Sequence, residues 1–242
     1  MIRIAAVGDI HFERDAGGPL RPLFERLDEE ADLLLIAGDL THHGDPEQAR
    51  ALASELKDLP VPIVAVLGNH DYSLDREGEI AHIVSDAGVT VLEGDAMTIE
   101  VEGRRVGVAG TTGFGGGWPP CWQASGEPET RAFIGRTQRL ARGLEQALSA
   151  LDGATRIALL HYSPVETTIA NDPPQLWPWL GSYLLGEALD NAGADLALHG
   201  HVHLGIHKGD TPGGVPVRNV SRPLLGRPFA ILRLDPEQGL LD

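Results

Sequence analysis

In the first part of the chain, short runs of apolar residues alternate with segments in which apolar residues recur every three or four positions. The continuous runs are typical of strands buried on both faces of a parallel sheet, and the spaced segments are typical of amphipathic helices. We therefore predict strands over residues 2–7, 32–37, 61–67 and 89–92, and helices over 20–30, 47–59 and 77–87. This alternation predicts a parallel sheet with its helices on the outer face.

The pattern changes after this sheet. Apolar and polar residues alternate over 97–102 and 105–109 around Glu102-Gly103-Arg104, which predicts a hairpin. A long amphipathic helix is expected over 131–151, with these residues toward the core: Phe133, Ile134, Leu140, Leu144 and Leu148. A helix is also predicted over 183–192, and strands over 156–160, 195–198, 215–220 and 229–234, the last two completing a second, mixed sheet. Two mixed β-sheets packed face to face and flanked by helices give an α/β fold, a four-layer αββα sandwich forming a single domain over 1–242.

Composition narrows the class of protein. The chain has 242 residues, 42% of them hydrophobic, and a formal charge of -16 from 35 acidic and 19 basic residues. Such a charge repels phosphate backbones, so nucleic acid is not an expected partner. The single cysteine, Cys121, excludes an intrachain disulfide and a thiolate metal cluster. No apolar run has transmembrane length and the first residues do not form a signal peptide, so we expect a cytoplasmic protein without a membrane span, of unspecified oligomeric state.

Residues that can bind metal follow the predicted strands. They are Asp9 and His11, Asp39, Asn69 and His70, His161, and His201 with His203. The carboxyl ends of parallel strands lie along one edge of a sheet, so these side chains are expected to converge in one crevice. A convergent set of N and O ligands without sulfur predicts Mn²⁺, Fe or Zn²⁺. Two ions can use this number of ligands more easily than one ion can.

The same residues carry a family resemblance. Gly8-Asp9-Ile10-His11, Gly38-Asp39, Gly68-Asn69-His70-Asp71, the solitary His161 and Gly200-His201-Val202-His203 resemble the ordered motifs of calcineurin-like metallophosphoesterases. The resemblance implies the αββα sandwich and two divalent metal ions. It implies that one ion is held by Asp9, His11 and His203, the other by Asn69, His161 and His201, and that Asp39 bridges both. A carboxylate suits the bridge because it has two oxygens and a negative charge between two cations.

The resemblance also implies catalytic roles. His70 would protonate the departing oxygen or stabilise its charge, the alternative being a structural histidine. Asp71 is a candidate to orient an imidazole, with a plain loop carboxylate as the alternative. His42 resembles the histidine that neighbours the catalytic one in the nuclease and phosphodiesterase branches. His43 and His207 have no such assignment and are expected to be exposed loop residues.

Substrate signals are fewer. Leu40-Thr41-His42 follows Asp39 where protein Ser/Thr phosphatases of the superfamily have Asp-Arg-Gly, which disfavours a protein substrate. The tryptophans lie in long connections, residues 111–127 and 171–182, and either stack on a substrate or fill space: Trp118, Trp122, Trp177 and Trp179. The glycine-rich segment 113–118 is expected to be a flexible loop. Arg222 and Arg227 are cations that could meet a phosphate, with surface salt pairs as the expected arrangement.

The predicted function is that of a binuclear metal-dependent phosphoesterase. It would hydrolyse a small phosphodiester or phosphomonoester, such as a nucleotide, by in-line attack of a metal-bridging hydroxide. Residues 161–182 resemble bacterial phosphoesterases related to cyclic-nucleotide phosphodiesterases. The alternatives are a nucleotide-sugar lipid pyrophosphate hydrolase, which would need an apolar lid, and a non-catalytic metal-binding scaffold of the same fold, which would tend to lose the ligands present here.

Overall fold

The first sheet contains the parallel strands expected from the amino-terminal pattern. The computed structural model describes residues 1–13, 20–120 and 124–241, so Cys121 and Trp122 lie outside it. The strand order is β12-β11-β1-β2-β3-β4, in which the four strands β1 to β4 are parallel. Their bounds are β1 Ile2–Val7, β2 Leu33–Ala37, β3 Ile63–Val66 and β4 Val89–Val91. The predicted parallel arrangement of these four strands is confirmed.

One strand belongs to a different sheet from the one predicted. β11 (Ala230–Asp235) pairs antiparallel with β1 in the first sheet, with Leu232 opposite Ile4, and β12 (Gly239–Leu241) pairs with β11. The prediction that 229–234 completes the second sheet was therefore wrong. β1 has an open edge on the side away from β2, and the alternating buried residues of β11 extend the layer between the sheets along that edge.

The second sheet is mixed, as predicted, and has the order β5-β6-β7-β8-β10-β9. The hairpin of β5 (Asp95–Val101) and β6 (Arg104–Thr111) is antiparallel, as is the pair β9 (Lys208–Asp210) and β10 (Pro216–Asn219). The pairs β6–β7, β7–β8 and β8–β10 are parallel, with β7 at Thr155–Leu160 and β8 at Leu196–His199.

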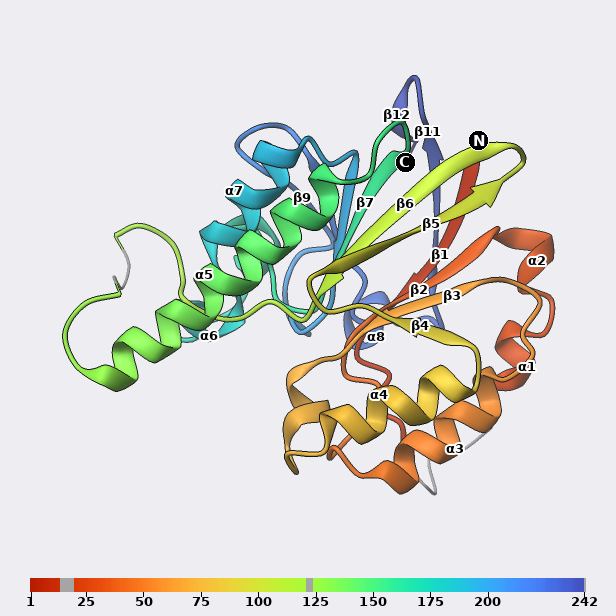
Figure 1. Ribbon diagram of the computed structural model, residues 1–242, viewed down its shortest axis with the longest axis horizontal. Coiled ribbons are helices and arrows are strands. Elements are labelled where there is room, and N and C mark those ends of the chain that lie inside the picture. Colours follow the sequence, from red (N-terminus) through yellow and green to blue (C-terminus); the bar gives the residue numbers. More distant parts are fainter. Residues whose placement is uncertain (14–19, 121–123, 242) are drawn as a thin grey trace.

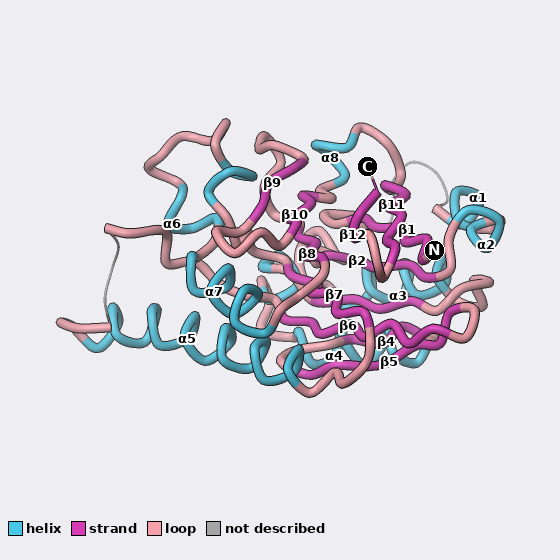
Figure 2. The backbone as a smooth tube through the Cα atoms, turned by 90° about the horizontal axis from the view of Figure 1, so that it is seen from above, coloured by secondary structure: helices cyan, strands magenta, loops and turns pink. Residues whose placement is uncertain are grey.

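Helices cover the outer faces of both sheets (Figures 1 and 2). The first sheet carries α1 (Arg21–Phe24), α2 (Leu27–Glu30), α3 (Pro46–Leu56) and α4 (Glu77–Asp86). The second carries α5 (Pro128–Ser149) and α7 (Tyr183–Ala192). The single helix predicted over 20–30 is instead two short ones, because Arg26 leaves the helical region at φ -114° and ψ 28°. Phe24 and Leu27 are both buried.

The apolar core has three layers, which explains the continuous apolar runs. In β2, Leu34 and Ile36 face the helices of the first sheet, whereas Leu33 and Leu35 face the second sheet. A third layer lies between the second sheet and α5 and α7, where Leu144 and Leu189 are fully buried. Each such side chain contributes about 1.5–3 kcal/mol of burial free energy. The αββα sandwich is thus confirmed.

Short helical turns occur in the connections at the carboxyl ends of the strands. They are η1 (Asn69–Tyr72), η2 (Glu166–Ile169), α6 (Trp177–Leu180) and α8 (Arg222–Leu225). Within the described ranges, no helix combines the length and the apolar character needed to cross a membrane.

Candidate metal centre

The predicted metal ligands meet where the strands of both sheets end. Candidate ligand atoms lie within 4.8 Å of one another in several groups, three of which are Asp9 with His11 and His203, Asp39 with His161 and His201, and His11 with Asp39 and His70. Asp9 follows β1 and Asp39 follows β2, while His161 follows β7 of the other sheet. The chain therefore brings the candidate ligands of both sheets to one place, as expected from the strand ends.

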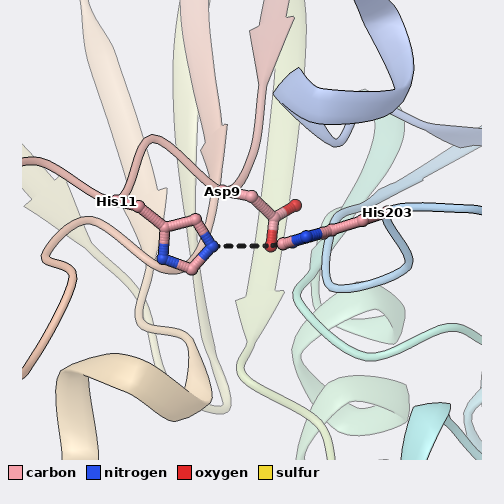
Figure 3. A group of neighbouring side chains, drawn as sticks. All are labelled: Asp9, His11 and His203. Atoms are coloured by element: carbon pink, nitrogen blue, oxygen red, sulfur yellow. Dashed lines mark ion pairs between the residues drawn. The ribbon is translucent and has the colours of Figure 1, made fainter.

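Asp9 is the centre of the first group. His203 and His11 approach its carboxylate from two sides (Figure 3), with Nε2 to Oδ1 distances of 3.2 Å and 4.0 Å. The backbone N–H of His201 donates to both Asp9 oxygens, at 3.0 Å and 2.9 Å. Asp9 is thereby held in place by the chain segment that carries His201 and His203.

Asp39 lies between the two groups. Its Oδ2 is 3.6 Å from His11 Nε2, and its Oδ1 is 3.4 Å from His161 Nε2. Its Oδ1 also accepts a hydrogen bond from the backbone N–H of His70 at 2.8 Å. The two oxygens of one buried carboxylate thus face histidines of different groups.

Backbone carbonyls fix the proton positions on three imidazoles. His161 Nδ1 lies 2.9 Å from the carbonyl of Ala37, His201 Nε2 3.1 Å from that of Trp179, and His70 Nδ1 2.6 Å from that of His42. A carbonyl only accepts, so these nitrogens carry the protons, and the other nitrogen of each neutral ring keeps a lone pair. This arrangement is the usual one for a histidine that binds metal.

Several atoms at the centre lack the partners that burial normally requires. Both ring nitrogens of His11 are buried without a hydrogen bond among the described residues. His161 Nε2 and the Asn69 side-chain oxygen are 2.9 Å apart, although with Nδ1 donating to Ala37 both atoms are acceptors. Two acceptors at this distance repel one another unless a cation lies between them, and orphaned buried polar atoms cost about 1–3 kcal/mol each. The residues therefore fit divalent cations.

Electrostatics at the centre differs from residue to residue, and the hydrogen bond to Asp9 raises the pKa of His203, unlike those of His11 and His201. Burial lowers the pKa of His11 to about 4 and that of His201 to about 3, so both rings keep free lone pairs at neutral pH. Burial alone would raise the pKa of Asp9, but the hydrogen bond from His203 and nearby imidazoles lower it to about 2. Burial raises the pKa of Asp39 to about 6, and a bound cation would bring it down.

The motif glycines are required by close approach of the ligands. A Cβ at Gly68 would lie 2.1 Å from the Oδ1 of Asp39, and a Cβ at Gly38 would lie 2.4 Å from the Nδ1 of His161. The ligand loops are also strained, since Asp9, Asp39 and His201 adopt φ values of 56°, 49° and 66°. Left-handed backbone at non-glycine residues is costly and concentrates at functional sites, which the sequence alone did not indicate.

The structure brings His70 and His42 together beside the ligands. The His70 ring is 4.5 Å from that of His11 and 5.7 Å from that of His42, and its Nε2 is 4.0 Å from Asp39 Oδ2. His42 is half-buried, with its Nδ1 3.5 Å from Glu13. His43 is exposed as expected.

Asp71 is neither an imidazole partner nor a plain loop carboxylate. It is fully buried and accepts hydrogen bonds from the backbone N–H groups of Leu40, Thr41 and Gly68 and from the Thr41 hydroxyl, at 2.7–3.1 Å. It therefore joins the loop after Asp39 to the loop before Asn69. No imidazole of the described chain forms a hydrogen bond or ion pair with Asp71.

Two residues near the ligands were missed in the sequence. Tyr162 packs on His201 with ring centroids 4.3 Å apart, and burial raises its pKa to about 12. His199 is fully buried, with its Nδ1 donating to the Gly200 carbonyl at 2.8 Å and its Nε2 2.9 Å from the Thr168 hydroxyl. Each is next in the sequence to a motif residue, Tyr162 to His161 and His199 to Gly200, and this position was the signal that could have indicated them.

One expectation about loops was wrong. His207 is half-buried rather than exposed, because its Nδ1 donates to the Asn219 carbonyl at 2.7 Å. The segment 113–118 is held by hydrogen bonds, including Gly116 N–H to the Pro178 carbonyl at 2.7 Å and the Thr137 hydroxyl to the Gly115 carbonyl at 2.5 Å. Of the described tryptophans, Trp118 and Trp177 are half-buried and in contact edge-on, whereas Trp179 is 59% exposed.

The Asp, Asn and His side chains gathered at the strand ends of this αββα sandwich are those expected of a metallophosphoesterase. Residues 2–205 match the family of calcineurin-like phosphoesterases, and the chain belongs to that family. The family is one of phosphoesterases, and it uses divalent metal ions.

Curated relatives match over short segments. A probable cyclic nucleotide phosphodiesterase of Xenorhabdus bovienii is 33% identical over 22% of this chain and 21% of its own length. One from Synechococcus is 32% identical over 29% of this chain and 31% of its own length. The chain thus spans less than a third of the curated relatives it matches. Phosphopantetheinyl hydrolase from Mycobacterium tuberculosis has a similar fold, with a TM-score of 0.70 at 15% identity, covering 98% of this chain and 97% of that one.

Proposed function

We propose that the protein is a binuclear metal-dependent phosphoesterase that hydrolyses a small phosphodiester or phosphomonoester. The position of Asp39 carries this proposal, because its two oxygens face His11 on one side and His161 on the other. A single ion would leave one of these groups unused, whereas two ions would use both.

The proposed ligand sets follow from this position. Asp9, His11 and His203 would hold one ion, Asn69, His161 and His201 the other, with Asp39 shared. Mn²⁺, Fe or Zn²⁺ suits such N and O ligands. Two bound cations supply Lewis-acid stabilisation of phosphoryl oxygens and lower the pKa of water. The neutral amide of Asn69 leaves the pair more positive, which favours an anionic substrate.

His70 is the proposed proton donor to the leaving oxygen. Its Nδ1 proton is fixed on the His42 carbonyl, so its Nε2 points toward the Asp39 side of the centre. To act as a donor the ring would carry a second proton, on Nε2. As water attacks phosphorus and the opposite P–O bond breaks, Nε2 would give this proton or a hydrogen bond to the departing oxygen, and proton transfer would leave the neutral ring with its proton on Nδ1. His42 would position this ring through its carbonyl. Asp71, which contacts only loop groups, would hold the Asp39 and Asn69 loops together.

A small nucleotide diester is the proposed substrate class. The curated relatives are named as probable cyclic nucleotide phosphodiesterases, and the loop after Asp39 lacks the Asp-Arg pair of protein phosphatases. The charge of -16 disfavours a nucleic-acid strand.

A nucleotide-sugar lipid pyrophosphate is a second candidate substrate. Apolar side chains are exposed beside the centre: Trp179, whose carbonyl binds His201, is 59% exposed, and Leu204, which follows His203, is 68% exposed. An acyl chain would cover such a surface. Faster turnover of an acylated nucleoside diphosphate ester than of its unacylated form would favour this candidate.

The test compares bis(p-nitrophenyl) phosphate with p-nitrophenyl phosphate after chelation and Mn²⁺ repletion. We expect turnover that requires Mn²⁺, and a loss of ~10²-fold or more in kcat on His70→Ala with metal retained. His82→Ala is the matched control, since its side chain on α4 is 76% exposed and lies outside the centre. Metal-loaded, folded protein without turnover of either ester would contradict the proposal.

A further inference from the structure

A pocket of about 530 Å³ opens on the side of the centre formed by Asp9 and His11. Its other wall is formed by Arg222 and Arg227, together with Pro223 and Pro228. Two of the proposed metal ligands and both arginine residues therefore line the same pocket.

The arginines are presented by a segment that is fastened to the first ligand loop. The backbone N–H of Arg222 donates to the Gly8 carbonyl at 2.9 Å, and that of Gly8 donates to the Val220 carbonyl at 2.8 Å. α8 then ends at Gly226, whose φ of 60° is accessible to glycine without strain. The pale blue helix beside Asp9 in Figure 3 is this segment. Arg222 is thus held one residue beyond a bridge to the chain that carries Asp9.

Among the described residues, neither Arg222 nor Arg227 forms the surface salt pair expected from the sequence. Within the described chain, no carboxylate oxygen lies within 4.0 Å of the guanidinium of Arg222 or Arg227, although the protein has 35 acidic residues. By contrast, Arg3 pairs with Asp32 at 2.6 Å. Arg222 is half-buried and Arg227 is exposed, so both have access to a ligand in the pocket.

We propose that Arg222 and Arg227 form a subsite for a second anionic group of the substrate, a phosphate or a carboxylate beyond the phosphoryl group that is hydrolysed. The proposal rests on the proposed function, since it assumes that the reacting phosphoryl group lies at the Asp9 side of the pocket. Guanidinium groups bind such anions through charge-assisted hydrogen bonds, often two at once. In a protein of charge -16 these two cations would offset the repulsion of a second anion near Asp9.

The test uses two substrates that differ only in the second anion. They are the p-nitrophenyl ester of thymidine 5′-phosphate and the same ester carrying a 3′-phosphate, and both release p-nitrophenolate. We expect kcat/KM of the Mn²⁺-loaded enzyme to be ~10-fold or more higher for the 3′-phosphorylated ester, as charge-assisted hydrogen bonds allow. The double variant Arg222→Gln/Arg227→Gln should bring the ratio close to one, and the Lys/Lys variant should restore part of it.

Arg139→Ala is the control for lost charge. Arg139 is exposed on α5 and, within the described ranges, has no ion pair, so its replacement should leave the substrate ratio unchanged. A wild-type ratio near one, or a ratio that survives in the glutamine variant, would overturn the subsite.

If neither ester is turned over, the proposed function fails, and binding decides the subsite separately. Calorimetry of the Mn²⁺-loaded protein would then compare thymidine 3′,5′-bisphosphate with thymidine 5′-phosphate. Tighter binding of the bisphosphate that is lost in the glutamine variant would support the subsite, and equal affinities would overturn it.

Discussion

Replacing Gly68 with alanine is expected to disable the metal centre by steric contact alone. The backbone of Gly68 is extended, at φ -114° and ψ 177°, so alanine meets no conformational strain there. Its Cβ, however, would lie 2.1 Å from Asp39 Oδ1 and 2.2 Å from Asp39 N, where real Cβ contacts are not closer than 3.0 Å. The Asp39 carboxylate or the Gly68 strand end must therefore move by roughly 1 Å.

Such a shift acts on every contact of the proposed bridging carboxylate. Asp39 Oδ1 accepts from His70 N–H at 2.8 Å and lies 3.4 Å from His161, so moving it disturbs both the proposed metal site and the position of His70. We expect a loss of ~1–3 kcal/mol in unfolding free energy, as for other overpacked cores. We also expect Mn²⁺ affinity to fall ~100-fold, the upper range for residues that hold a ligand in place. Urea unfolding and calorimetric Mn²⁺ titration measure the two effects.

Gly78→Ala is the matched control. Gly78 lies within α4, and a Cβ there meets no atom within 4 Å. The same chemical change should therefore stabilise the protein by ~0.5–1 kcal/mol, because alanine has the higher helix propensity, and leave Mn²⁺ affinity unchanged. Wild-type Mn²⁺ affinity and turnover in Gly68→Ala would refute the steric reasoning.

Three further predictions concern pH, the buried polar network and the sheet order. Because burial raises the pKa of Asp39 to about 6, protons compete with the metal below that pH, so calorimetric Mn²⁺ affinity should fall from pH 7 to pH 5; constant affinity would contradict this. Thr168→Val removes the hydrogen-bond partner of His199 Nε2 and should lower the free energy of unfolding, measured in urea, by ~1–3 kcal/mol. An unchanged urea midpoint would show that this hydrogen bond does not stabilise the fold. Leu232→Ala should cost ~2–5 kcal/mol because Leu232 is buried opposite Ile4; a loss under ~0.5 kcal/mol would contradict the placement of β11.

The amino-acid sequence alone predicted the layers and the residues that meet at the strand ends. The residues of β2 are apolar on both faces of the strand because one face packs on helices and the other packs on the second sheet. A continuous apolar run of this kind identifies a buried strand from the local sequence. Asp9, Asp39 and His161 could be identified because parallel strands bring their carboxyl ends to one edge, whatever the details of packing. The order of the motifs along the chain then sufficed for the family.

Tertiary structure alone decided the partners that are distant in sequence. The strand β11 has the same alternating pattern that either sheet would accept, and only the open edge of β1 assigns it to the first sheet. Asp71 reads as a loop carboxylate until Leu40 and Thr41, some thirty positions away, are seen to donate to it. Arg222 joins the Asp9 pocket through a backbone hydrogen bond to Gly8. Such contacts depend on how separate segments pack, and the local pattern of a chain carries no record of that.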